Sequence, residues 1–134
     1  MAQEKIPFGE KILSFNFPSD WEKEPLHPNP SISFDHPHDA ILQALENPIH
    51  SPPLREIVKP SQKVAVVISD ITRLWVRTDL FLPSILQVLN QKGVKDEEIV
   101  LIVATGTHRD NSLEEIRKIV GEEVSQKVRV LNHH

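Results

Sequence analysis

The sequence predicts an α/β domain in which helices flank a parallel β-sheet. Three short and almost uniformly apolar segments, 63–68, 99–104 and 128–131, lie in the second half of the chain, and two segments of helical periodicity separate them. Uniform apolar runs are typical of parallel strands covered on both faces, and alternation of strands with helices is typical of crossover connections. Each run is followed by polar residues, at the end of the strand where parallel sheets bind ligands.

The first 60 residues differ in composition from the rest. Nine of the eleven prolines come before residue 60. We expect residues 1–60 to form a proline-rich lead-in that packs on the core, with one strand at 13–17, where apolar and polar residues alternate, and one helix from an Asp35 cap to about Asn47. Residues 61–134 then form the βαβαβ core that carries the site loops.

Two helices are expected between the three strands of the core. The first covers 79–91, with Pro83 in its early turns and Gly93 as a left-handed stop. The second begins with Ser112 and Glu115 at the spacing of a capping box, in which each side chain accepts a hydrogen bond from the other residue's backbone N–H. Right-handed crossovers through these helices then place all three strand-end loops at one edge of the sheet.

A three-stranded parallel sheet is small for this fold class. The sequence ends directly after the third apolar run. We therefore expect it to be an N-terminal fragment of a larger two-domain protein. Alone, the fragment is expected to self-associate or to bind a partner that covers apolar surface, and in the parent that partner is the remainder of its own chain.

Charge and composition narrow the choice of partners. The net charge is −4 and the basic residues are scattered, so the sequence lacks the basic stripe that supplies nucleic-acid affinity. The absence of cysteine excludes disulfides, thiolate metal ligands and a cysteine nucleophile. No apolar run approaches the roughly 18 residues that span a bilayer. We expect a cytoplasmic protein that binds neither nucleic acid nor membrane.

Candidate site residues follow the first two strands of the core. Asp70, Thr72 and Arg73 offer a carboxylate, a hydroxyl and a planar guanidinium that suits a carboxylate or phosphate group. In the next loop Gly106 permits a tight backbone path and presents His108, which can act as a general acid or base. A structural interpretation stands beside each: Asp70 caps a turn, Arg73 pairs with a surface acid, and His108 is a hydrogen-bonding loop residue.

Other histidines and a tryptophan have weaker signals. His133 and His134 follow the third strand and could reach the same edge of the sheet, although fraying is the default at a chain end. Trp75 is interpreted as packing beside the core, or as the floor of a pocket next to Arg73. No metal site is predicted, because the lead-in histidines lack the spacing of metal ligands; these are His27, His36, His38 and His50.

Several ordered motifs resemble the nickel-dependent lactate racemase family. The most specific are Ser-Asp-Ile-Thr-Arg at 69–73 and Gly-Thr-His-Arg at 106–109, with further similarity at 47–56, 114–124 and 130–133. The resemblance spans nearly the whole chain and corresponds to about the first third of a family member.

The resemblance implies a racemase or epimerase of small 2-hydroxy acids that uses a nickel-pincer nucleotide. In that family a histidine removes the hydroxyl proton of the substrate while hydride passes to the cofactor, and His108 matches one of the two catalytic histidines. The remaining motif residues are implied to bind cofactor or substrate; they are Asp70, Thr72, Arg73, Gly106, Thr107 and Arg109.

The sequence also departs from the family pattern. Leu74-Trp75-Val76 stands where the family usually has Pro-x-Pro, which alters the expected pocket wall. The second catalytic histidine, the lysine that tethers the cofactor and the histidine that binds nickel are expected beyond residue 134. We therefore expect the full-length parent to be the enzyme, and the 134 residues alone to be inactive and without bound cofactor.

The alternative is a non-catalytic α/β module that binds a nucleotide or carboxylate or forms an interface. A hydrolase is less consistent with the residues, because no nucleophile elbow is recognisable.

Overall fold

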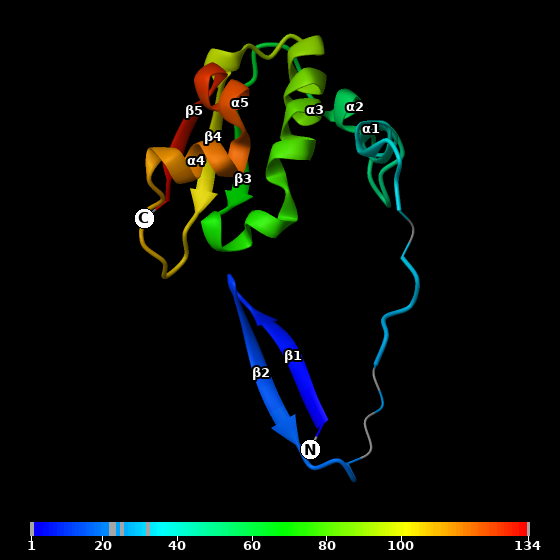
Figure 1. Ribbon diagram of the computed structural model, residues 1–134. Coiled ribbons are helices and arrows are strands. Elements are labelled where there is room, and N and C mark those ends of the chain that lie inside the picture. The colour runs from blue at the N-terminus through cyan, green and yellow to red at the C-terminus, as the bar shows by residue number, and fades with distance from the viewer. Residues whose placement is uncertain (1, 22–23, 25, 32, 134) are drawn as a thin grey trace. The chain divides into compact units, whose positions relative to one another are not determined.

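Two compact units make up the structure, a computed structural model that describes residues 2–21, 24, 26–31 and 33–133 (Figure 1). The first unit is Met1–Ser33 and the second is Phe34–His134. Composition placed the division at about residue 60, whereas the structure places it earlier. The reason is that two proline-bounded helices between residues 34 and 60 belong to the core unit: prolines end these helices without separating them from their neighbours.

The first unit contains an antiparallel hairpin. Strand β1 (Ala2–Phe8) pairs with strand β2 (Lys11–Phe17) along its whole length. Gly9 in the connection has a φ of +61°, a left-handed conformation that hairpin turns require and glycine adopts without strain. The predicted strand at 13–17 lies within β2, but the prediction of a single strand was wrong because it missed β1.

Two short helices open the second unit, α1 (Pro37–Glu46) and α2 (Leu54–Ile57). Proline at the first position of α1 presets a helical φ where its missing N–H costs nothing. The predicted cap at Asp35 was wrong: His36 precedes the helix, and no side chain caps it. Helix α1 packs beside α3 (Thr78–Gln91), and His38 Nδ1 lies 3.1 Å from the hydroxyl of Ser84 across this contact.

Three parallel strands form the sheet of the second unit, in the order β3-β4-β5. They are β3 (Val64–Ser69), β4 (Ile99–Ala104) and β5 (Arg129–Asn132), and β4 has the bounds that the sequence predicted. The register sets Val64 opposite Ile99. The predicted α/β class with a parallel sheet is confirmed, and the carboxyl ends of all three strands meet at one edge, called the carboxyl edge below.

Helices α3, α4 (Leu113–Val120) and α5 (Glu122–Lys127) flank the sheet (Figure 1). Helix α3 continues through Pro83, and Gly93 follows it with a φ of +84°, as a left-handed stop requires. The predicted capping box opens α4. Helix α5 was not predicted, since its six residues are too few to show a periodic pattern. No helix in the described part of the chain is long and apolar enough to cross a membrane.

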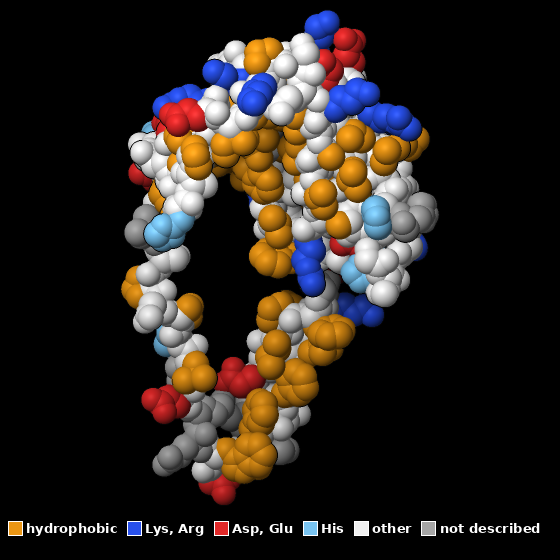
Figure 2. Space-filling view, turned by 180° about the vertical axis from the view of Figure 1, so that it is seen from behind, with side chains coloured by type: hydrophobic (Ala, Val, Ile, Leu, Met, Phe, Trp, Pro, Cys, Tyr) orange, Lys and Arg blue, Asp and Glu red, His pale blue; other side chains and the backbone are white. Residues whose placement is uncertain are grey.

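The two faces of the sheet differ in burial. Leu101 and Val103 have no exposed surface on the face that packs with α3, α4 and α5. On the opposite face, called the open face below, Val67 is 67% exposed and Leu131 is 38% exposed. The apolar runs predicted coverage of both faces, and within the described residues the open face does not have it. Figure 2 shows hydrophobic side chains at the surface of this unit.

Candidate active site

A cavity of about 440 Å³ opens at the carboxyl edge, between the loops that follow β3 and β4. Six of the seven predicted site residues line it; they are Asp70, Thr72, Arg73, Gly106, Thr107 and His108. Residues almost 40 positions apart in the sequence therefore share one cavity, because parallel strands bring their carboxyl ends together. The seventh residue, Arg109, does not line it.

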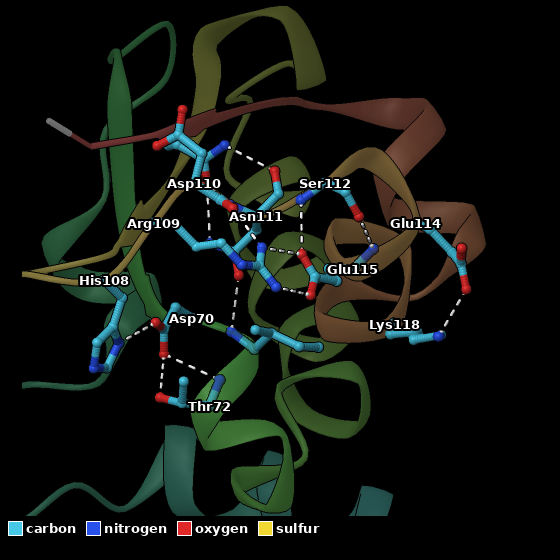
Figure 3. Close-up of polar contacts among 12 residues, drawn as sticks. Asp70, Thr72, His108, Arg109, Asp110, Asn111, Ser112, Glu114, Glu115 and Lys118 are labelled. Carbon is cyan, nitrogen blue, oxygen red and sulfur yellow. Dashed lines mark hydrogen bonds and ion pairs between the residues drawn. The ribbon is translucent and has the colours of Figure 1, made fainter.

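Asp70 and His108 form a side-chain pair in this cavity (Figure 3). Oδ2 of Asp70 lies 2.6 Å from Nδ1 of His108, and the other carboxylate oxygen accepts hydrogen bonds from the hydroxyl and the backbone N–H of Thr72. Asp70 is 4% exposed, whereas the imidazole of His108 is 51% exposed. The pair therefore joins a buried carboxylate to an imidazole that solvent or a ligand can reach.

Hydrogen bonding keeps Asp70 ionised. The hydroxyl of Thr72 contributes most to lowering the pKa of Asp70 below its ordinary value, burial opposes this shift, and His108 reinforces it. An ionised carboxylate only accepts hydrogen bonds, so Nδ1 of His108 carries the proton that they share. In the neutral imidazole Nε2 is then the basic nitrogen, which is the arrangement that a general base needs.

Local backbone structure explains the position of both residues. Asp70 caps the 3₁₀ helix η1 (Ile71–Val76), as the structural alternative for this residue predicted, and the same side chain contacts His108. Gly106 has a φ of +60° in a turn closed by a hydrogen bond from the N–H of His108 to the carbonyl of Thr105. This φ is the left-handed region that suits glycine, and the turn presents His108 to the cavity.

The three arginines near the carboxyl edge differ in their partners. Arg109 donates to both carboxylate oxygens of Glu115, over 2.9 and 2.7 Å, and Arg77 is held in the same way by Asp79. Hydrogen bonds from the guanidinium of Arg109 and next from the N–H of Ser112 lower the pKa of Glu115 to about 2. Arg109 thus fastens its loop to the start of α4, which differs from the ligand-binding role that the motif implied.

Arg73 is the arginine left for a ligand. Its side chain is exposed and lines the cavity, and no carboxylate of the described residues pairs with it. A planar guanidinium without a protein partner favours a bidentate contact with a carboxylate or phosphate group. The alternative of a surface ion pair is thus not observed among the described residues, and the ligand-binding role of Arg73 stays a prediction.

Sequence reasoning missed two asparagines at the carboxyl edge. Asn111 follows the His108 loop and Asn132 ends β5, and their amides hydrogen-bond to each other. Asparagine often mimics backbone in loops, which is the signal that their positions offered. Asn132 lies in the Val-Leu-Asn-His motif that resembles the family, but nothing in the sequence predicted its hydrogen bonds with Asn111.

Other candidates lie elsewhere. The backbone of His133 is held at both ends, with its N–H bonded to Val103 and its carbonyl to the hydroxyl of Thr105, so this residue does not fray. His134 lies outside the described residues. Trp75 is 75% exposed, so neither of its predicted packing roles is observed. No cluster of three metal-binding side chains occurs among the residues that the structure describes.

These features define the class of protein: an α/β domain with a carboxylate–imidazole pair in a cavity at the carboxyl edge of its sheet, beside a guanidinium that no described carboxylate pairs with. Comparison with known families then specifies it. Residues 8–134 match the lactate racemase N-terminal domain, so the chain belongs to that family, and the resemblance seen in the sequence is confirmed.

Individual relatives agree with this assignment. The chain is 27% identical over 136 residues to a lactate racemase of Thermoanaerobacterium thermosaccharolyticum, covering 99% of this chain and 31% of the relative. It is 30% identical over 95 residues to a lactate racemase of Lactiplantibacillus plantarum, covering 71% of this chain and 22% of the relative. The solved structure of the lactate racemase apoprotein from T. thermosaccharolyticum superimposes with a TM-score of 0.77 at 27% identity, covering 99% of this chain and 30% of that one. The chain thus spans less than a third of each relative.

Proposed function

We propose that this chain supplies one catalytic base and one carboxylate-binding group to a racemase or epimerase of small 2-hydroxy acids of the lactate type. The observation that carries the proposal is the 2.6 Å contact between His108 and Asp70 in a cavity that Arg73 also lines. Membership of the lactate racemase N-terminal domain family supports the substrate class.

Each of the three side chains has a distinct task. Nε2 of His108 accepts the hydroxyl proton of the substrate, and the Asp70 carboxylate stabilises the imidazolium that forms. Arg73 binds the substrate carboxylate through its planar fork and so orients the α-carbon. The hydroxyl of Thr72 donates its hydrogen bond to Asp70, so Thr72 acts through the carboxylate rather than on the ligand.

A nickel-pincer nucleotide is the cofactor that we propose for the full-length protein. With Arg73 assigned to the substrate carboxylate, the exposed hydroxyl of Thr107 has the chemistry to hydrogen-bond to a nucleotide. The nickel ligands are proposed to lie in parts of a longer polypeptide, as the family resemblance implies. When bound, the cofactor supplies a site that takes hydride from the α-carbon and returns it.

The partners of the chain follow from the same proposal. The remaining part of a longer racemase supplies the second base and the cofactor tether, so the 134 residues alone are inactive. Self-association of the chain through apolar surface, a cytoplasmic location and the absence of nucleic-acid binding stay predictions.

A non-catalytic carboxylate- or nucleotide-binding module is the second candidate. The unpaired Arg73 favours it, because an anion can bind at this guanidinium without any proton transfer. The departure from Pro-x-Pro at Leu74-Trp75-Val76 also sets the chain apart from the family pattern next to this residue.

A racemisation assay tests both candidates. The chain replaces the matching N-terminal part of the T. thermosaccharolyticum lactate racemase, and the chimera, loaded with cofactor, is assayed on D- and L-2-hydroxy acids. We expect turnover that falls by about 10²–10⁴-fold in His108→Ala, the range for losing a general base. The control His27→Ala changes an exposed histidine outside the cavity and should keep full activity. A folded and loaded chimera that turns over no acid would favour the binding module.

A further inference from the structure

The side-chain amides of Asn111, which is buried, and Asn132, which is partly buried, join the loop after β3, the loop after β4 and the end of β5 at the carboxyl edge. Oδ1 of Asn111 accepts a hydrogen bond from the N–H of Ile71 over 3.0 Å, and Nδ2 of Asn111 donates to Oδ1 of Asn132 over 3.0 Å. The side chain of Asn132 also forms two hydrogen bonds with the backbone of Asn111. It accepts from the N–H over 3.1 Å and donates to the carbonyl over 3.0 Å. Asn111, labelled in Figure 3, therefore contacts both the start of η1 and the end of β5.

Burial makes these contacts hard to replace. Asn111 is 5% exposed, so water has little access to its amide. The N–H of Ile71 is also partly buried, and an unsatisfied buried donor costs free energy. The chain can therefore lose the Asn111 amide only by opening the loops to solvent or by leaving Ile71 without an acceptor.

The position of these links in the sequence gives them a second consequence. Ile71 is the neighbour of Asp70, and Asn111 lies three residues after His108. The loops after β3 and β4 are therefore joined twice, once by the Asp70–His108 contact and once by the Ile71–Asn111 contact. A single contact to a half-exposed imidazole leaves the ring free to exchange its partner for water. Two contacts between the same loops fix both their separation and their orientation.

We propose that Asn111, held by Asn132, is a positioning residue that keeps the carboxylate of Asp70 aligned with the imidazole of His108. Asn111 lies behind the pair and does not line the cavity, so it acts through the loops. The structural part of this inference is independent of the proposed racemase function, and only its catalytic consequence rests on that function.

Nuclear magnetic resonance of the imidazole of His108 in the 134-residue chain tests the inference without any substrate. The readout is the exchange rate with water of the Nδ1 proton, which the contact to Asp70 protects. In Asn111→Ala we expect this proton to exchange about tenfold faster, because the loss of a buried hydrogen bond costs on the order of 1.4 kcal/mol or more. Backbone amides of β4 report whether the chain stays folded.

Two further variants separate positioning from general destabilisation. Asn90→Ala removes an amide that bonds to Val94 and Asp96, outside the cavity, and should leave the His108 proton unchanged. Asn132→Ala keeps the Asn111–Ile71 contact but removes its support, and should give an intermediate rate. Should Asn111→Ala unfold the chain, Asn132→Ala decides the matter. Unchanged protection of the His108 proton in folded Asn111→Ala or in Asn132→Ala, or equal acceleration in Asn90→Ala, would overturn the inference. Because no turnover is measured, these outcomes are distinct from failure of the racemisation assay.

Discussion

The covered face of the sheet and its carboxyl edge use the same strands but depend on different interactions. On the covered face, Leu101 and Val103 are held by apolar burial, which has no preferred direction. At the edge, Asp70, His108 and Asn111 are held by hydrogen bonds, each of which needs its own partner in place. Stability and site geometry are therefore largely separable in this protein, because stability depends mainly on the core and site geometry on a small polar network.

The largest expected effect is on the covered face. Leu101→Ala should lower the free energy of unfolding by about 2–5 kcal/mol, because it leaves a cavity in a fully buried site. Ile102→Ala is the matched control, since its side chain points to the open face and is only partly buried. Urea denaturation measures both. Equal losses would show that the open face is covered in solution, for example by a second copy of the chain.

A smaller effect is expected where the edge meets α4. Ser112→Ala removes the side-chain cap of this helix and should cost about 1 kcal/mol. Ser125→Ala, in which the lost hydroxyl bonds to an exposed carbonyl of α5, should cost less. Thermal denaturation compares the two. If the two variants lost the same stability, the cap would contribute no more than an ordinary surface hydroxyl.

The loss of stability at acid pH should depend on carboxylates near the carboxyl edge rather than on the apolar core. Because the contacts with Arg109 and with the N–H of Ser112 lower the pKa of Glu115 from its ordinary 4.5 to about 2, the folded state favours the ionised form. The resulting stabilisation is fully present above about pH 4.5 and is lost as the pH falls toward 2. Asp70, whose pKa is also lowered, acts with the same sign.

Denaturation at intervals between pH 5 and 2 measures this dependence. Glu115→Gln should flatten the fall in the free energy of unfolding, and Lys95→Gln, which alters an exposed ion pair with Glu97, should not. A wild-type curve as flat as that of Glu115→Gln would argue against the Arg109–Glu115 pair.

The smallest effect on stability is expected for Arg73→Ala. Its guanidinium has no described carboxylate partner, so the free energy of unfolding should change by less than about 0.5 kcal/mol. Shifts in the amide resonances of residues 104–108 on titration with lactate should nevertheless disappear in this variant. Arg77→Ala, which breaks a pair with Asp79 outside the cavity, should retain them. Retained shifts in Arg73→Ala would place the anion elsewhere.

Local signals in the sequence account for what was predicted correctly. The bounds of β4 and the capping box of α4 are encoded within a few adjacent residues. Strand β1 was missed because Gln3, Glu4 and Lys5 break the alternation that marks a strand, and only pairing with β2 makes it one. The open face was missed because the apolar pattern of a strand does not record which neighbours are present.

The same contrast holds for the site. Residue type and loop position were enough to group Asp70, Arg73 and His108 at one edge. Arg109 is paired because Glu115 accepts its hydrogen bonds, whereas the sequence predicted only a capping role for Glu115. The Asn111–Asn132 contact joins residues 21 positions apart and has no local signature. Partner choice among polar side chains is thus the part of the site that required a three-dimensional structure.

The carboxylate of Glu115 offers an experimental advantage. One of its oxygens accepts from the N–H of Ser112 over 2.8 Å and from Arg109 over 2.9 Å, so the first turn of α4 and the loop that carries His108 share an atom. Leu113 begins this turn and is exposed. A spectroscopic label at Leu113 would therefore sense a rearrangement of the loop from outside the cavity, and the helix would serve as a reporter of events that leave its own fold intact.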